Sequence, residues 1–138
     1  MDGAAEVYRG GCNCGAVRYE VRGPLDPVVN CHCHQCRETH GHFAAYTSAA
    51  RKDVTLTEER GLSWYHASDI ARRGFCRLCG GSLFWEGHGK GSIEIAAGTL
   101  AGNTGLKSVA HIFVADKGDY YEITDGLPQF PRSREADD

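Results

Sequence analysis

Seven cysteines stand in three short groups along this chain, and their spacing is typical of metal ligands. Thiols two or three positions apart can direct their sulfurs at one ion, and thiolate sulfur is a preferred ligand of zinc. Because the number of cysteines is odd, they cannot all pair as disulfides within one chain. The three groups are Cys12 and Cys14; Cys31, Cys33 and Cys36; and Cys76 and Cys79.

The first and third groups are similar to each other beyond their cysteines. Both "CNCGAVRY" (12–19) and "CRLCGGSLFW" (76–85) place a glycine directly after the second cysteine and continue into a strand-like run with an aromatic residue. A glycine at this position lets backbone N–H groups turn toward the sulfurs, as in a zinc knuckle. We therefore predict one closed site of four thiolates, in which a structural zinc joins two segments far apart in the sequence.

The middle group, within "CHCHQCR" (31–37), then remains as a three-thiolate site. Three protein ligands with a free coordination position are the pattern of a catalytic zinc. Side chains alternate along a strand, so Cys31 and Cys33 point to one side, and a following turn can bring Cys36 round to them. Zinc held by three thiolates is a weak Lewis acid for water but keeps a bound thiol ionised. Such a site suits thiol chemistry better than hydrolysis.

Other interpretations of these residues stay open. His32 or His34, with His40 and His42 nearby in the sequence, could complete a second closed site and make both ions structural. The C-x2-C pair could be a redox pair, although a thioredoxin-type pair begins a helix and this pair runs into glycine and a strand. Inert core cysteines do not explain three thiols within six residues. His111, in the apolar run "VAHIFV", is predicted to be a hydrogen-bonded interior histidine.

Length, charge and hydropathy argue against several classes of protein. The 138 residues fit a single zinc-binding domain, predicted over 1–138 with its core at about 7–130. Lys and Arg total 15 and Asp and Glu total 18, a net charge of −3 that is not typical of a nucleic-acid binder. No secretory signal pattern is visible, and no apolar run reaches the ~20 residues of a membrane span. We therefore expect a cytoplasmic protein with neither nucleic-acid nor membrane partners, in a reducing compartment that favours metal binding over disulfides.

Short β-type runs separated by glycine must position the cysteines, and they predict an all-β domain of antiparallel sheets. The expected strands cover 16–23, 27–31, 53–57, 62–66, 82–86, 92–98, 109–116 and 119–124. A hairpin turn at Lys117 and Gly118 is expected to join the last two. One short helical turn is predicted after Cys33, because "HQCRET" lacks glycine and proline. The exposed edges of such a domain also leave a homodimer open.

Taken in order, these motifs resemble the glutathione-dependent formaldehyde-activating enzyme family, which includes the centromere protein V group. The resemblance runs from about residue 10 to residue 130. It is carried by "GGCNCGAVRYEV", "CHCHQCRETHG", "WYHASDIARRGFCRLCGGSLFW", "IEIAAGTL" and "HIFVADKGDYYEITDGLPQF". The spacing C-x-C, C-x-C-x2-C and C-x2-C is its most specific part.

This resemblance implies a β-tent fold with two zinc ions per chain, one structural and one catalytic. The implied ligands are Cys12, Cys14, Cys76 and Cys79 for the structural zinc, and Cys31, Cys33 and Cys36 for the catalytic zinc. The implied activity is that of a carbon–sulfur lyase, which adds glutathione to formaldehyde to give S-hydroxymethylglutathione or cleaves this adduct. The expected partners are therefore a small thiol such as glutathione and an aldehyde.

Further residues are candidates for substrate binding and proton transfer. The arginines that could anchor substrate carboxylates are Arg37, Arg72 and Arg73. The histidines that could carry the proton are His32, His34 and His40. A zinc-binding module or glutathione carrier without turnover is the alternative to an enzyme, because a fold by itself does not determine activity. A zinc redox switch is a third hypothesis.

Overall fold

The computed structural model describes residues 7–134, which form a mostly β domain of two sheets with one α-helix. The smaller sheet contains β1 (Val7–Gly11), β2 (Arg18–Arg22) and β5 (Val54–Glu58). The larger sheet contains β3 (Val28–Cys31), β4 (Ala44–Ala50), β6 (Leu62–Tyr65), β7 (Ala71–Cys76), β8 (Ser82–Gly87), β9 (Ser92–Ala96) and β10 (Ser108–Ile112). The helical elements are α1 (His34–His40) and the short 3-10 helices η1 (Arg51–Asp53), η2 (Ala97–Thr99) and η3 (Val114–Asp116). No helix within residues 7–134 is both long and apolar enough to cross a membrane.

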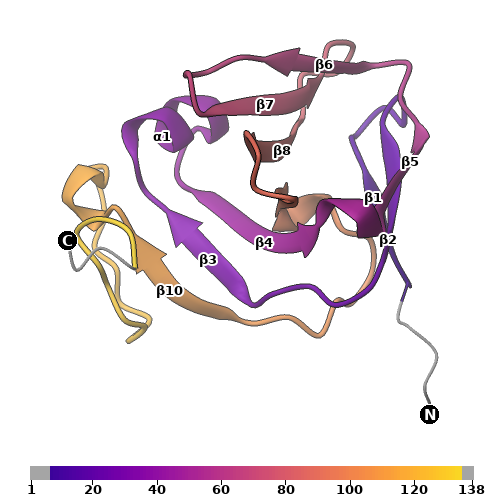
Figure 1. Ribbon diagram of the computed structural model, residues 1–138. Helices are drawn as coiled ribbons and strands as arrows, with labels where there is room; N and C mark the ends of the chain where they lie inside the picture. Colours follow the sequence, from indigo (N-terminus) through magenta and orange to yellow (C-terminus); the bar gives the residue numbers. More distant parts are fainter. Residues whose placement is uncertain (1–6, 135–138) are drawn as a thin grey trace.

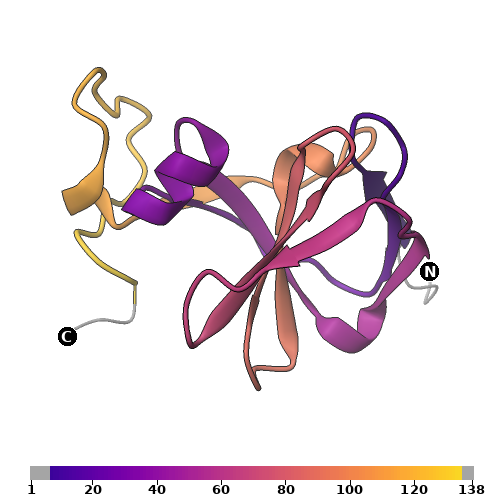
Figure 2. The same cartoon turned by 90° about the horizontal axis from the view of Figure 1, so that it is seen from above.

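The larger sheet has the strand order β10–β3–β4–β9–β8–β7–β6, and the smaller sheet has the order β1–β2–β5. Figure 1 shows the larger sheet curving from β10 at the bottom to β6 at the top, with the smaller sheet at the right. The C-terminal segment lies at the end of the molecule opposite to β1 and β2 (Figure 2). The helix α1 connects β3 to β4 and reaches the loop before β7, where Gln35 Nε2 donates to the carbonyl of Ala67 over 3.3 Å.

The main apolar core joins the smaller sheet to one face of the larger sheet. It contains Tyr19 and Val21 of β2 and Ile93 and Ile95 of β9, and the Tyr19 ring lies edge-on to Phe84 of β8. Because side chains alternate along a strand, Glu94 lies on the opposite face of β9 from these isoleucines. That opposite face carries a second, smaller cluster around Cys31 and Cys36, and it forms the candidate functional site.

The predicted all-β class is confirmed, as are seven of the expected strands and the helical turn after Cys33. Three strands were not expected: β1, β4 with its alanine-rich sequence, and β7, which carries two arginines and a glycine. The expectation of purely antiparallel sheets is wrong at one place, because β10 pairs with β3 in parallel.

The strand predicted at 119–124, and with it the hairpin turn at Lys117 and Gly118, is also wrong. The outer edge of β10 is instead occupied by residues that lie later in the chain. His111 N donates to Pro128 O and Phe130 N donates to His111 O, each over 2.9 Å. The predicted strand 109–116 also ends early, at Ile112, because Phe113 adopts a left-handed conformation with φ of 55°.

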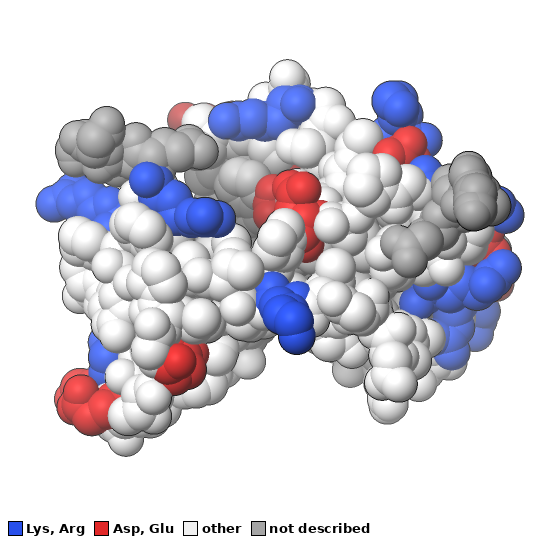
Figure 3. Space-filling view, turned by 90° about the horizontal axis from the view of Figure 1, so that it is seen from below, with Lys and Arg blue, Asp and Glu red and all other residues white. Residues whose placement is uncertain are grey.

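Charged side chains on the face shown in Figure 3 form separate groups. Basic and acidic groups are scattered among uncharged residues, near the centre of this face and at both of its ends. A continuous basic band, which nucleic-acid-binding surfaces usually show, is not present among these residues.

Candidate functional site

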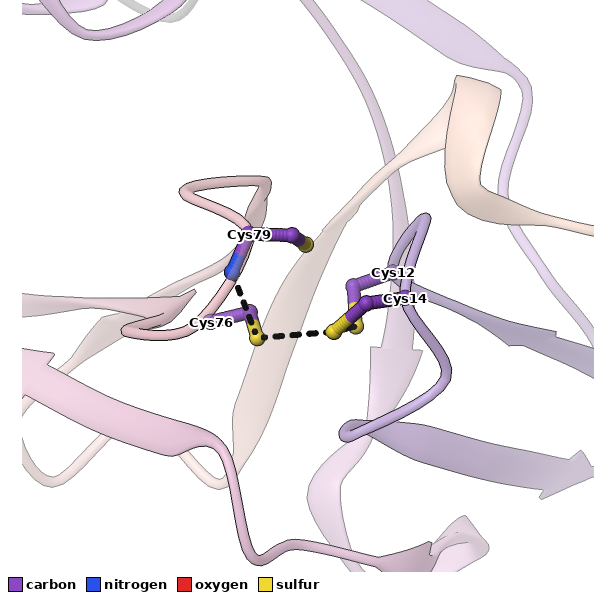
Figure 4. A group of neighbouring side chains, drawn as sticks. All are labelled: Cys12, Cys14, Cys76 and Cys79. Atoms are coloured by element: carbon purple, nitrogen blue, oxygen red, sulfur yellow. Dashed lines mark hydrogen bonds between the residues drawn. The ribbon is translucent and has the colours of Figure 1, made fainter.

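Cys12, Cys14, Cys76 and Cys79 form the first cysteine cluster, whose four sulfurs all lie within 4.8 Å of one another. The turn between β1 and β2 supplies the first pair, and the last residue of β7 with the turn after it supplies the second (Figure 4). The Sγ atoms of Cys12 and Cys14 are 3.8 Å apart, and those of Cys14 and Cys76 are 3.7 Å apart. Two of the cysteines are buried and two are exposed. The cluster therefore brings sulfurs from the smaller sheet and from the larger sheet within reach of one ion.

The two turns of this cluster share two features, a backbone N–H that donates to the first sulfur and a glycine after the second cysteine. Val17 N donates to Cys12 Sγ over 3.3 Å, and Cys79 N donates to Cys76 Sγ over 3.4 Å. The glycines after the second cysteines, Gly15 and Gly80, have φ of 85° and 82°, a region that glycine adopts without steric cost. The similarity between the first and third cysteine groups in the sequence thus corresponds to two turns that each hold a sulfur and contain a left-handed glycine.

Cys31, Cys33 and Cys36 form the second cluster, and their sulfurs also lie within 4.8 Å of one another. Cys31 ends β3, Cys33 is the N-cap of α1, and Cys36 lies in the first turn of that helix. Cys36 N donates to Cys33 Sγ over 3.4 Å, so the helix cap itself brings two of the sulfurs together. The sequence prediction that a turn brings Cys36 back toward Cys31 and Cys33 is confirmed.

The three thiols of this second cluster affect one another's ionisation strongly. Hydrogen bonds from Cys31 and Cys36, together with the positive charge of Arg73, lower the pKa of Cys33. Hydrogen bonds with Cys33 and Cys36, followed by burial, raise the pKa of Cys31 well above its usual range. Three sulfurs this close cannot all ionise beside the single positive charge of Arg73, because their negative charges repel. The donor set therefore fits a soft metal ion.

The second cluster opens onto a cavity of about 720 Å³. All three of its cysteines line the cavity, whereas none of the four cysteines of the first cluster does. The other lining residues are Gln35, Tyr46, Ser68, Ile70, Arg73, Trp85, Glu94, Ile112, Phe113 and Ser133. The cavity wall is thus largely apolar, with a few polar groups near the sulfurs, which is the usual character of a small-molecule site.

Arg73 of β7 is the central polar residue of this wall, and only 5% of it is exposed. Its Nη2 approaches Cys36 Sγ at 3.6 Å, its Nη1 donates to the hydroxyl of Tyr46 over 3.1 Å, and its Nε donates to Gln35 Oε1 over 3.3 Å. Burying a guanidinium is costly unless its N–H groups find partners, and here each nitrogen has one. The three contacts hold the positive charge against the second cluster.

Tyr46 connects Arg73 to His40. The Tyr46 hydroxyl lies 3.1 Å from His40 Nε2. Burial raises the pKa of Tyr46, and burial followed by the charge of Arg73 lowers the pKa of His40, so both groups are neutral at neutral pH. His40, Tyr46 and Arg73 also line a second hollow of about 290 Å³, which places His40 between the cavity wall and this hollow.

Of the sequence candidates for substrate and proton handling, the structure brings Arg73 to the second cluster and His40 to Tyr46, and it leaves the others elsewhere. Arg72 pairs with Glu86 and stacks on Trp64, and Arg37 Nη1 donates to the carbonyl of Asp116. His34 is exposed. His42, which the sequence left open as a fourth metal ligand, is hydrogen-bonded to Tyr120.

His32 is buried, and both of its ring nitrogens have partners. One nitrogen lies 2.9 Å from His111 Nδ1, and the other lies 3.0 Å from the Tyr121 hydroxyl. His111 in turn bonds Asp125 over 2.7 Å, which confirms its prediction as a satisfied interior histidine. Because its nitrogens are occupied, His32 is not available as a fourth ligand of the second cluster.

Sequence reasoning missed Tyr46, Trp85 and Glu94, which line the cavity. The one signal for Glu94 was its place between two isoleucines in "SIEIAAG", where alternation puts it on the non-core face. Tyr46 and Trp85 carry no comparable signal, because an aromatic residue in a strand is ordinarily part of the core.

Known proteins similar to this chain place it in a family. The family model "glutathione-dependent formaldehyde-activating enzyme" matches residues 7–116, and the chain belongs to this family. It is 28% identical over 125 residues to an uncharacterized lyase of Schizosaccharomyces pombe, covering 89% of this chain and 90% of that protein. The crystal structure of a Rhodobacter sphaeroides protein superposes with a TM-score of 0.58 at 26% identity, covering 72% of this chain and 97% of that one.

Proposed function

We propose that this protein is a zinc-dependent carbon–sulfur lyase-type enzyme that joins a small thiol to an aldehyde or cleaves their adduct. The pair assigned to the family, glutathione and formaldehyde giving S-hydroxymethylglutathione, is the first substrate pair to test. Membership of the family and the lyase relative support the reaction class. The observation that carries the proposal is that the three-cysteine cluster opens onto a cavity beside Arg73 and Tyr46.

Two zinc ions per chain would fit the two donor sets. The first cluster offers four sulfurs, the complete tetrahedral set of a structural zinc. The second offers three sulfurs, with His32 held by other partners, which fits a catalytic zinc that keeps one position for substrate. Zinc bound by Cys31, Cys33 and Cys36 would keep the sulfur of a thiol substrate ionised at neutral pH.

The residues around the cavity would handle the charge and the proton of the addition. The substrate sulfur forms a bond to the carbonyl carbon, the π bond of the carbonyl breaks, and negative charge appears on the oxygen. Arg73 and Tyr46 present N–H and O–H donors on the cavity wall, and both could stabilise this oxygen. The oxygen gains one proton, and the thiol has lost one on ionisation, so the reaction balances.

Tyr46 is the residue we assign as proton donor. With His40 in its Nε2–H tautomer, the Tyr46 oxygen accepts from both His40 and Arg73, which leaves the phenol proton free for an acceptor in the cavity. His40 would replace this proton from the neighbouring hollow. The reverse reaction, cleavage of an adduct, uses the same groups in the opposite protonation states.

Carbon-13 NMR of labelled formaldehyde with several thiols tests this function. Because such adducts also form without a catalyst, the quantity to measure is the exchange rate between free aldehyde and adduct, with and without protein. We expect the native, zinc-loaded protein to accelerate exchange and the Cys36→Ser protein at the same concentration to have no effect. Thiol binding without accelerated exchange would contradict the enzyme and indicate a carrier.

A further inference from the structure

Three cavity residues form a row across the larger sheet. Arg73 of β7 is paired with Trp85 of β8, and Trp85 is paired with Glu94 of β9. Directly paired residues of antiparallel strands point to the same face, and neighbouring strands are about 4.8 Å apart. The guanidinium, the indole and the carboxyl group therefore lie in sequence along one wall, and all three line the cavity.

The two charged members of this row differ in how they are partnered. Arg73 already contacts Cys36, Tyr46 and Gln35. Glu94, by contrast, forms no ion pair with any basic side chain in residues 7–134. Burial raises its pKa and the nearby charge of Asp26 adds to this, while a hydrogen bond with Ser48 acts in the opposite direction. A cation in the cavity would relieve both unfavourable effects on the ionised carboxylate.

We propose that Glu94 binds an ammonium group of the thiol substrate, so that the substrate class is an aminothiol. This inference rests on the proposed function, because it assigns the sulfur of the same molecule to the three-cysteine cluster. The cavity that holds the sulfurs also holds Glu94, and the indole of Trp85 between Arg73 and Glu94 adds an aromatic surface that favours cations. An ammonium group is thus recognised at one part of the wall and a sulfur at another.

The charges of the cavity favour the same class. Three thiolates around one divalent ion carry a formal charge of −1, Arg73 contributes +1, and ionised Glu94 contributes −1. The cavity is then net negative, which disfavours a thiol that carries carboxylates and no ammonium group. A tripeptide thiol such as glutathione has an ammonium group and so remains within the class, as does a short aminothiol.

The test compares thiols that differ only in their ammonium group. Cysteamine is compared with N-acetylcysteamine, and glutathione with N-acetylglutathione, in native protein and in Glu94→Gln. Acetylation also changes the pKa of the thiol, but this effect is the same for native protein and for Glu94→Gln. It therefore cancels when the preference for the free amine over the acetylated thiol is compared between the two proteins. Glu58→Gln is the matched control, since Glu58 pairs with Arg60 on the smaller sheet and does not line the cavity.

For each pair of thiols, we take the ratio of kcat/KM for the free amine to kcat/KM for its acetylated partner. We expect this ratio to be about 10-fold larger in native protein than in Glu94→Gln, because a charge-assisted hydrogen bond contributes about this factor. The change should appear mainly in KM, because the ammonium group is remote from the reacting sulfur. Glu58→Gln should keep the native ratio, and Glu94→Asp, which keeps the charge, should keep part of it. The thiol pair with the larger ratio, cysteamine or glutathione, shows which kind of aminothiol places its ammonium group at Glu94.

An unchanged ratio in Glu94→Gln would overturn the assignment of Glu94 while leaving the enzyme proposal intact. If no thiol is turned over, the proposed function fails, and the same ratios are then taken from calorimetric binding of the four thiols. Equal affinities for free and acetylated thiols in native protein would also overturn the inference. Zinc content and circular dichroism of each variant show that it is folded and loaded.

Discussion

The Nη2 atom of Arg73 lies 3.6 Å from the sulfur of Cys36, so a buried positive charge is held directly against the three-cysteine cluster. The contact joins β7 to the first turn of α1, two elements that are far apart in the sequence. Arg73 also donates to Tyr46, which makes it the link between the sulfurs and the polar side of the cavity.

Replacing Arg73 with lysine should lower kcat/KM for thiol–aldehyde exchange by about 10-fold or more, because lysine cannot make the three separate contacts of a guanidinium. Zinc content should stay at two per chain, since Arg73 is not a ligand. Arg72→Lys is the control, because Arg72 lies beside Arg73 in β7 but pairs with Glu86 outside the cavity. Equal losses in the two variants would argue against a special role for Arg73.

The two cysteine clusters should respond differently to loss of one sulfur. Cys36→Ser should lose about one zinc per chain while keeping its β circular dichroism, because the second cluster lies within one continuous stretch of chain. Cys76→Ser should lower the free energy of unfolding by about 3–5 kcal/mol, because it would remove a metal cross-link between two segments that are far apart in the sequence, as loss of a disulfide across a long loop does. Metal analysis and chemical denaturation measure both effects. Full stability of Cys76→Ser would contradict the structural assignment of the first cluster.

Tyr46→Phe should reduce kcat by about 100-fold with a smaller change in KM, because it removes the hydroxyl between Arg73 and His40 while keeping the ring. The ring fills the cavity wall in either case, so the fold should persist. His34→Gln serves as the control, since His34 is exposed on the same helix as His40. A Tyr46→Phe protein with native kcat would exclude Tyr46 as proton donor.

Gly61→Ala should disturb the first cluster through steric contact alone. A Cβ atom at Gly61 would lie 2.8 Å from Cys76 Sγ and 2.7 Å from the Cβ of Ala16, closer than such atoms approach in folded proteins. We expect a loss of about 1–3 kcal/mol in unfolding free energy, together with weaker zinc retention in the presence of a chelator. Gly98→Ala, whose Cβ would meet no atom within 4 Å, should behave like the native protein.

Stability at high pH should depend on Tyr19. Burial raises the pKa of Tyr19 to about 12, whereas an unfolded tyrosine titrates near ~10. The folded state therefore favours the neutral phenol over the ionised one. The stability that the neutral Tyr19 phenol contributes is complete below about pH 10 and is lost as the pH rises to about 12. Tyr19→Phe should be less stable at pH 7 by about 1 kcal/mol, because its hydrogen bond to Thr99 is lost.

The native protein should be the more stable of the two at pH 7, and its advantage over Tyr19→Phe should fall as the pH is raised from 10 to 12 and then reverse in sign, because a pKa difference of about 2 units corresponds to about 2–3 kcal/mol. Denaturant titrations at several pH values measure this difference. Tyr65→Phe, which changes an exposed tyrosine, should show no such trend. A constant difference across the window would mean that Tyr19 is not the titrating group.

Several features of this protein could be predicted from sequence because they depend on residues close together in the chain. The two knuckle-like turns follow from cysteine and glycine spacing, and the helical turn after Cys33 follows from the lack of breakers. The grouping of Cys31, Cys33 and Cys36 is local in the same way. Their roles as zinc ligands stay predictions.

The interior of the site was decided by contacts between strands that a single sequence does not reveal. Arg72 and Arg73 are adjacent and chemically alike, so only the register of β7 against β8 determines that Arg73 faces the cavity with Trp85. Glu94 enters the same row through the register of β8 against β9. The strand expected at 119–124 failed because residues 128–130 occupy the edge of β10 instead.

The cysteine groups that could hold a metal ion can therefore be recognised in the amino-acid sequence, because ligand spacing within a turn is a short-range property of the chain. The charged and aromatic side chains that surround the sulfurs are known only from the folded chain. Their placement depends on strand register, and a shift of one residue turns every side chain of a strand to the other face.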